Sequence, residues 1–120
     1  MLVLSVALGG ALGALARLGL MQGLQSLFGG TFPYATFVIN ITGSFALGFL
    51  LEIFTWTWNP SADTKAFLVT GFLGAFTTFS TFSMDIVFLL QKRAMLEAAL
   101  YVAGSVFFSL IGFIAGMKCV

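Results

Sequence analysis

The chain is built from long apolar stretches separated by short polar ones. Four apolar stretches are long enough to cross a membrane as helices, at residues 2–26, 32–57, 64–91 and 95–117. A hydrocarbon core about 30 Å thick requires roughly 20 helical residues. The stretches between them read FGGTFP, WNPSAD and QKRA, and they contain the Gly, Pro, Asn and charged residues typical of turns. Because these connections are short, the pattern predicts four helices, each antiparallel to the next.

The composition requires an apolar environment. Of the 120 residues, 60% are hydrophobic and only 8% are charged, whereas a soluble domain has about 25% charged residues. Tyr34, Trp56 and Trp58 lie at the ends of the predicted spans, where amphipathic rings prefer the membrane interface. We therefore predict an all-α membrane protein in which residues 1–120 form a single four-helix transmembrane domain.

Several classes of function are excluded by what the chain lacks. It has no His, which is the usual general base and the commonest transition-metal ligand. Its one Cys, Cys119, cannot form a disulfide within the chain. The net charge of +1 gives no reason to expect nucleic acid as a partner. There are also no paired carboxylates and no phosphate-binding loop, so we expect neither an enzyme nor an organic cofactor.

The basic residues do not fix an orientation in the membrane. Lys65 and Lys118 lie on one side of the predicted bundle, and Lys92 and Arg93 lie on the other. Counting Arg17 with the nearer end of its span makes the balance two against three, which is too even for the positive-inside rule to decide. The pattern is consistent with one fixed topology, and equally with insertion in both orientations followed by pairing as an antiparallel dimer.

Small and polar residues indicate where the spans meet. Glycines spaced four apart allow helices to approach closely in lipid, and three pairs have this spacing: Gly9 and Gly13, Gly19 and Gly23, Gly112 and Gly116. Two polar stripes run along otherwise apolar helices. The second span carries Thr36, Asn40 and Gly43, and the fourth carries Tyr101, Ser105 and Ser109.

Each stripe has two interpretations. A lone Ser or Thr can bond its own helix backbone or a neighbouring helix, so these residues alone are compatible with simple packing. Asn40 is different, because the local backbone cannot satisfy both the donors and the acceptor of its amide. We therefore expect Asn40 to line a pathway through the membrane.

The third span contains the most unusual segment, GFLGAFTTFSTFSMD at residues 71–85. Gly71 and Gly74, followed by the β-branched pair Thr77 and Thr78, predict a helix broken in mid-membrane, with the break placed over residues 71–77. A break frees carbonyl groups that must line a cavity, bind a cation or be buried against protein.

Beyond the predicted break, phenyl rings and hydroxyl groups alternate. Phe76, Phe79 and Phe82 recur every three residues, while Thr77, Thr81 and Asp85 recur every four and form a polar face. The edge of a phenyl ring is electropositive and can meet an anion without a full charge that would trap it. The segment is therefore typical of an anion pathway, although lipid-facing Phe is the simpler reading of spacing alone.

Four segments together resemble one known family. GGALGALAR (9–17), GTFPYATFVINITGSFALG (30–48), GFLGAFTTFSTFSMD (71–85) and YVAGSVFFS (101–109) are similar to the Fluc, or CrcB-type, fluoride channels. The resemblance covers all four spans. It implies a dual-topology antiparallel homodimer with two pores, located in the cell (inner or plasma) membrane of a prokaryote, that passively exports fluoride and so reduces its toxicity.

The resemblance also implies roles for individual residues. Asn40, Phe79, Phe82, Ser80, Thr81, Tyr101, Ser105 and Ser109 match the fluoride pathway, and Thr36 joins them through its place on the Asn40 stripe. The carbonyls of Gly74 and Thr77 match the site of a structural Na⁺ at the dimer interface. Arg17 and Asp85 are candidates for an electrostatic or gating role.

Two departures and two alternative functions stay open. Asp85 stands where many members have Glu, and Ala75 stands where the family often has a second Gly, which leaves conduction rate and ion affinity undetermined. A small dual-topology proton-coupled multidrug or cation exporter would need a carboxylate within its first span, where this chain has only Arg17. A lytic or structural membrane protein would not need an Asn stripe facing a Phe-Ser-Thr segment.

Overall fold

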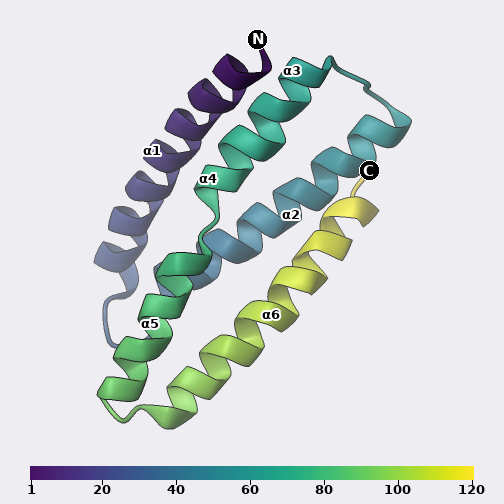
Figure 1. The fold of residues 1–120 in the computed structure, drawn as a ribbon. Coiled ribbons are helices and arrows are strands. Elements are labelled where there is room, and N and C mark those ends of the chain that lie inside the picture. The colour runs from purple at the N-terminus through teal and green to yellow at the C-terminus, as the bar shows by residue number, and fades with distance from the viewer.

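The computed structural model describes residues 1–120, and every regular element is a helix (Figure 1). Three spans are single helices: α1 (Leu2–Phe28), α2 (Tyr34–Trp56) and α6 (Met95–Lys118). The third span is composite, with α3 (Ala62–Lys65), the π-helix η1 (Ala66–Leu73), α4 (Gly74–Phe76) and α5 (Phe79–Gln91). All four spans are long and apolar enough to cross a membrane. The predicted fold class is confirmed, and each predicted span end lies within two residues of the observed one.

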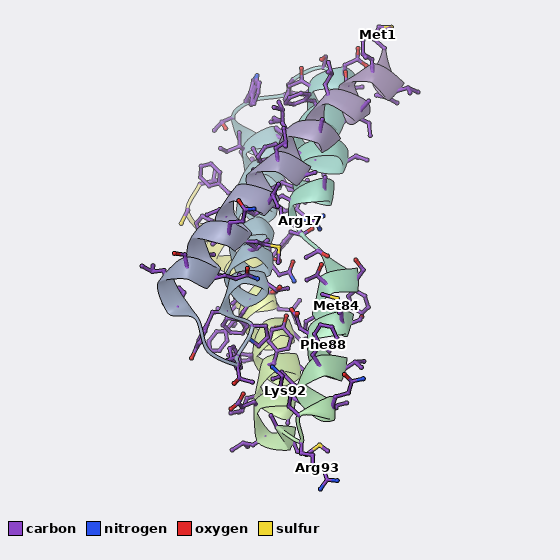
Figure 2. The ribbon with its side chains drawn as sticks, turned by 90° about the vertical axis from the view of Figure 1, so that its left-hand side faces the viewer. Met1, Arg17, Met84, Phe88, Lys92 and Arg93 are labelled. Atoms are coloured by element: carbon purple, nitrogen blue, oxygen red, sulfur yellow. The ribbon has the colours of Figure 1, made fainter.

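The spans are arranged as two closely packed pairs. α1 packs along η1 and α4, the first half of the third span, whereas α2 packs along α6 (Figure 1). α5 contacts α6 rather than α1. Both chain termini lie at one end of the bundle, and the α5–α6 turn with Lys92 and Arg93 lies at the end far from Met1 (Figures 1 and 2). The composite span therefore passes from one pair to the other as it crosses.

Glycines make these close approaches possible. A Cβ added at Gly9 or Gly13 would collide with the carbonyl groups of Phe67 and Phe72 on η1. At the α2–α6 contact, a Cβ on Gly116 would collide in the same way with the Phe45 carbonyl. Two of the three predicted glycine pairs thus lie at helix contacts. The third does not, because Gly19 and Gly23 have no atom of another helix within 4 Å of an added Cβ.

The third span is interrupted, but not where the glycines suggested. Gly71 lies within η1, and Gly74 has the helical angles φ −61° and ψ −38°. The break is formed by Thr77 and Thr78, which are extended with ψ angles of 158° and 122°. β-Branched residues favour this conformation. The predicted break in mid-span is confirmed, whereas its placement over residues 71–77 is corrected to Thr77–Thr78.

Gly71 has a packing role instead. It is buried, and a Cβ there would lie 2.8 Å from the Val6 carbonyl and 3.0 Å from the Gly10 nitrogen, both on α1. The π-helical form of η1 was not predicted, because its sequence AFLVTGFL is apolar almost throughout and so shows no period that would distinguish a π-helix from an α-helix.

Two small apolar clusters flank the break. Ile39, Leu73 and Phe76 form one, and Phe82, Leu89, Ala98 and Tyr101 form the other. Only 17 of the 120 residues are buried, so most apolar side chains face outward, as a lipid environment requires. On α5, for example, Phe88 is about half exposed (Figure 2).

The glycine contacts give a direct test of the fold. Gly13→Ala should destabilise the protein by about 1–3 kcal/mol, because the new methyl group overpacks against the Phe72 backbone. Gly23→Ala is the matched control on the same helix, since nothing lies within 4 Å of its added Cβ. The melting temperatures of both variants are measured by thermal unfolding in detergent. Equal melting temperatures for the two variants would contradict this α1–η1 packing.

Candidate functional site

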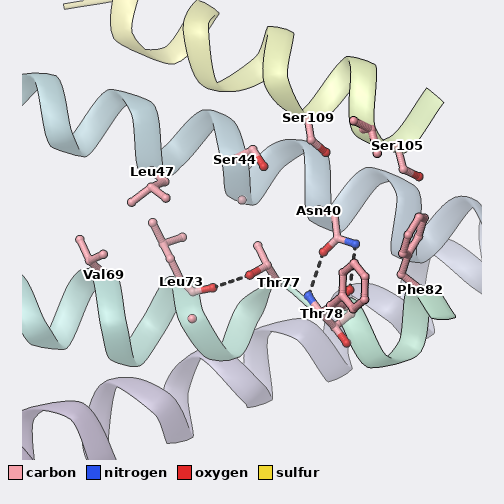
Figure 3. A pocket seen from close by; sticks show the side chains of 14 residues that line it. Asn40, Ser44, Leu47, Val69, Leu73, Thr77, Thr78, Phe82, Ser105 and Ser109 are labelled. Carbon is pink, nitrogen blue, oxygen red and sulfur yellow. Dashed lines mark hydrogen bonds between the residues drawn. The ribbon is translucent and has the colours of Figure 1, made fainter. Parts of the chain in front are cut away.

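Asn40 of α2 clamps the break in the third span. Its Nδ2 donates a hydrogen bond of 3.0 Å to the Thr78 carbonyl, and its Oδ1 accepts one of 2.8 Å from the Thr78 N–H (Figure 3). These are the two backbone groups of Thr78 that the interruption removes from the helical ladder. The Asn40 amide thus supplies the two hydrogen-bond partners that a continuous helix would have given Thr78. In the middle of a membrane span there is no bulk water to supply them.

The break brings two half-helix ends together within the bundle. α4 ends at Phe76 and α5 begins at Phe79. Thr78 caps α5, because its Oγ1 accepts a hydrogen bond of 3.2 Å from the Thr81 N–H. The first N–H groups of a helix carry a partial positive charge, and the last carbonyls carry a partial negative one. An electropositive and an electronegative helix end therefore lie side by side in the middle of the span.

A cavity of about 390 Å³, here called the first cavity, opens at this point (Figure 3). Both predicted polar stripes reach it, Asn40 and Gly43 from α2, and Ser105 and Ser109 from α6. The other lining residues are Ser44, Leu47, Val69, Leu73, Gly74, Thr77, Thr78, Phe79, Phe82 and Val106. None of the lining residues is ionisable. The cavity offers amide and hydroxyl groups without a full charge.

Ser105 has an unsatisfied hydroxyl in this cavity. The residue is only 6% exposed, yet its Oγ has no hydrogen-bond partner in the chain. By contrast, Thr42 outside the cavity donates to the Val38 carbonyl of its own helix at 2.8 Å. A buried hydroxyl without a partner costs about 1–3 kcal/mol, so Ser105 is suited to a ligand or water in the cavity.

The three phenylalanines predicted as one series have separate positions. Phe79 and Phe82 line the first cavity with their ring centroids 5.6 Å apart. Phe76 precedes the break and is buried against Ile39 and Leu73. Because the break resets the helical phase, the three-residue period does not continue from Phe76 to Phe79. Phe79 is 78% exposed, so its ring projects from this chain beside the polar cavity.

A second cavity of about 370 Å³ lies toward the α1–α2 loop. Three polar residues from the predicted set line it, Thr36 of α2 and Thr81 and Asp85 of α5. Loop residues 29–33 and the end of α1 complete its wall. The polar face that was predicted to run from Thr77 through Thr81 to Asp85 is thus divided between the two cavities.

Tyr101 lies beside both cavities and belongs to neither lining. It is fully buried, and its hydroxyl donates a hydrogen bond of 2.9 Å to Asp85 Oδ2. Its ring packs against Phe82 with a centroid separation of 5.1 Å. Tyr101 therefore connects an aromatic residue of the first cavity with the carboxylate of the second.

This arrangement can be compared with known proteins. The family described as CrcB-like protein, Camphor Resistance (CrcB), matches residues 4–117. The chain belongs to the CrcB family. It is 44% identical over 119 residues to the fluoride-specific ion channel FluC of Rhodospirillum centenum, covering 99% of this chain and 94% of that relative. It is also 48% identical over 118 residues to FluC of Cereibacter sphaeroides, covering 98% and 93%.

The remaining predicted residues of this CrcB-family chain lie outside both cavity linings. Ser80 is exposed on α5, with its hydroxyl 3.4 Å from that of Thr78. Arg17 is partly exposed on α1, about two-thirds of the way along that helix (Figure 2). The side chain of Arg17 forms no hydrogen bond within the chain.

One residue with a central role was missed. Thr78 both receives the Asn40 clamp and caps α5, whereas the sequence marked it only as one of two β-branched residues. Its position immediately before the α5 segment FSTFS was the available signal, because Thr is a preferred N-cap residue.

The clamp predicts a stability effect that is separate from transport. Asn40→Ala should destabilise the protein by about 2 kcal/mol or more, since it leaves the N–H and the carbonyl of Thr78 without partners. Thr42→Ala is the control on the same helix, because the Thr42 hydroxyl bonds only its own backbone. Unfolding followed by circular dichroism would compare them. A melting temperature unchanged in Asn40→Ala would show that the clamp does not hold the break.

Proposed function

We propose that this chain is a passive fluoride channel that exports fluoride from the cell and thereby reduces its toxicity. The observation that carries the proposal is the first cavity, which combines hydrogen-bond donors and phenyl rings with no ionisable side chain. Relatives along nearly the full length of the chain bear the name fluoride-specific ion channel. The chemistry is that of ion transport, so the chain is not an enzyme.

The donors of the first cavity suit a small, strongly hydrated anion. One N–H of the Asn40 amide bonds Thr78, which leaves the second free, and the Ser105 hydroxyl has no other partner. The positive end of α5 lies at the same place. These groups can replace part of a hydration shell, while the ring edges of Phe79 and Phe82 contribute a weak positive field. Without a fixed cation the ion is not trapped.

The proposed pathway uses the residues predicted from the sequence. Asn40, Phe79, Phe82, Ser105 and Ser109 form its section in the first cavity, and Thr36, Thr81 and Tyr101 continue it toward the second, with Ser80 beside them. The hydroxyl groups follow one another from α6 to α5, so an ion can be passed between donors.

We propose that two copies of the chain assemble as an antiparallel homodimer with two pores. Phe79 is 78% exposed at the polar first cavity, and Ser80 next to it is exposed. Polar groups exposed to lipid at mid-span are unfavourable, so a second copy covering this face would stabilise it. The near balance of basic residues between the two ends permits both orientations.

A structural Na⁺ is proposed at the α4 end of the break. The Thr78 N–H bonds Asn40 and is therefore not available to the Gly74 carbonyl, which is its usual helical acceptor. Gly74 is exposed, and carbonyl oxygens are the donors that a hard cation prefers. The carbonyls of Gly74 and Thr77 from both copies would hold the ion, which would neutralise the negative helix ends where the copies meet.

Arg17 and Asp85 are proposed to act through charge. Arg17 would attract anions toward the bundle, and Asp85 would fix Tyr101 through the observed hydrogen bond. Membership of the CrcB family and four membrane-spanning helices make this a multi-pass membrane protein. The bacterial relatives support a location in the cell membrane of a prokaryote.

A proton-coupled multidrug or cation exporter is the alternative. Such a protein needs a carboxylate that exchanges protons at its binding site. The first cavity contains no carboxylate, and Asp85 accepts a hydrogen bond from the Tyr101 hydroxyl. The alternative is therefore not favoured.

Liposome flux tests the function. The purified protein should pass fluoride passively in response to voltage and largely exclude chloride. Phe79→Ile and Phe82→Ile should each reduce fluoride flux about fivefold or more while dimer assembly persists, since they remove a ring edge worth roughly 1 kcal/mol or more at the ion. Phe107→Ile on the exposed side of α6 is the control.

One result would overturn the proposed channel function, and another would overturn the proposed role of the phenyl rings. Proton-coupled drug uptake or large nonselective leakage by the parent would exclude a fluoride channel. If the parent conducts and both Phe variants conduct equally well, the ring edges have no part in the pathway.

Sodium dependence tests the proposed cation site. Replacing Na⁺ by N-methylglucamine should lower the fraction of dimer and its melting temperature, because the facing carbonyls then lack a counter-charge. The fraction of dimer is measured by crosslinking in detergent. An unchanged dimer in the absence of Na⁺ would exclude a structural role for the ion.

A further inference from the structure

Tyr101 connects residues that line the two cavities. The cavities have no lining residue in common. Phe82 faces the first cavity, and Asp85 and Thr36 face the second. Tyr101 lies between these residues and is fully buried. In the proposed pathway, an ion that moves from one cavity to the other passes the ring or the hydroxyl of Tyr101.

Tyr101 is held from two directions. Asp85 accepts a hydrogen bond from its hydroxyl at 2.9 Å, which fixes the outer end of the side chain. Phe32 meets its ring edge-on, with the centroids 5.5 Å apart and an interplanar angle of 84°. This geometry is the favoured one for two aromatic rings. The ring can therefore leave its position only if one of these contacts is lost.

Phe32 reaches Tyr101 from the loop between α1 and α2. Gly29 and Gly30 have φ angles of 58° and 77°, which turn the chain back over the end of the bundle. Phe32 follows this turn and packs against the cluster that contains Phe82 and Tyr101. It also lines the second cavity. A loop residue thus supports Tyr101 from the side of the second cavity.

We propose that Tyr101 narrows the passage between the two cavities, and that Phe32 is a positioning residue that sets anion selectivity by holding Tyr101 in place. This inference rests on the proposed function. Selection of a small anion over a larger one requires a constriction that does not widen, because a compliant wall would adapt to the larger ion. Phe32 supplies that rigidity through contact with the ring, and Asp85 supplies it through the hydroxyl.

The experiment compares the fluoride-to-chloride permeability ratio of variants in liposomes. Phe32→Leu keeps an apolar side chain but loses the edge-on ring, so Tyr101 gains freedom and the ratio should fall about three- to tenfold. Phe32→Tyr keeps the ring and should preserve the ratio. Phe88→Leu is the matched control, because Phe88 is about half exposed on α5 and lines neither cavity (Figure 2).

A second comparison separates positioning from a general effect on folding. If Phe32 acts through Tyr101, then Phe32→Leu should change nothing further in a Tyr101→Leu background. A fall in selectivity of the same size in both backgrounds would overturn the proposal, as would an unchanged ratio for Phe32→Leu in the parent. If Phe32→Leu is poorly expressed, Phe32→Met takes its place in both the parent and the Tyr101→Leu background.

The outcomes also distinguish this inference from the proposed function. If the parent does not conduct fluoride, the channel function fails. If the parent conducts selectively and the Phe32 variants do so as well, only the role of Phe32 fails. Melting temperatures of all variants are measured in parallel, and a loss of selectivity at an unchanged melting temperature is the expected result.

Discussion

The pair of hydrogen bonds between Asn40 and Thr78 is the interaction on which the rest of the site depends. A membrane span cannot be opened unless the freed backbone groups find new partners. One amide side chain supplies both partners here, with a donor and an acceptor on the same group. This permits Thr77 and Thr78 to be extended, and α5 to begin with a new phase and direction. The first cavity and the two half-helix ends exist because the Asn40 side chain takes the place of backbone hydrogen-bond partners.

The packing of the spans explains why the break can persist without unravelling its neighbours. Glycine contacts fix the first half of the third span against α1, and an equally close contact fixes α2 against α6. α5 contacts only α2 and α6, and it is attached to the start of α6 chiefly through Tyr101, Phe82 and Leu89. The helix that is proposed to line the pathway is thus supported by a few specific side chains, while the framework around it is supported by close backbone contact at glycines.

The spans were predictable because apolar length and short polar connections are properties of the sequence itself. Both polar stripes reach the first cavity through Asn40, Gly43, Ser105 and Ser109, since helical spacing decides which residues share a face. The position of the break was not predictable, because it depends on whether the extended pair at Thr77–Thr78 finds a partner on another helix. The same limitation applied to Phe76, whose separation from Phe79 and Phe82 depends on that change of phase. Gly71 was read as a helix breaker because its contact with α1 is not visible in local sequence.

The position of the termini has a consequence for how such a chain can be joined to a second copy. Both ends of the chain lie on the same side of the bundle (Figure 1). A short peptide that links the C-terminus of one copy to the N-terminus of another would hold the two copies parallel. A covalent pair in opposite orientations would instead need a linker that crosses the bilayer, so that a duplicated gene fused into one chain could keep the two halves inverted only by acquiring an additional membrane-spanning segment.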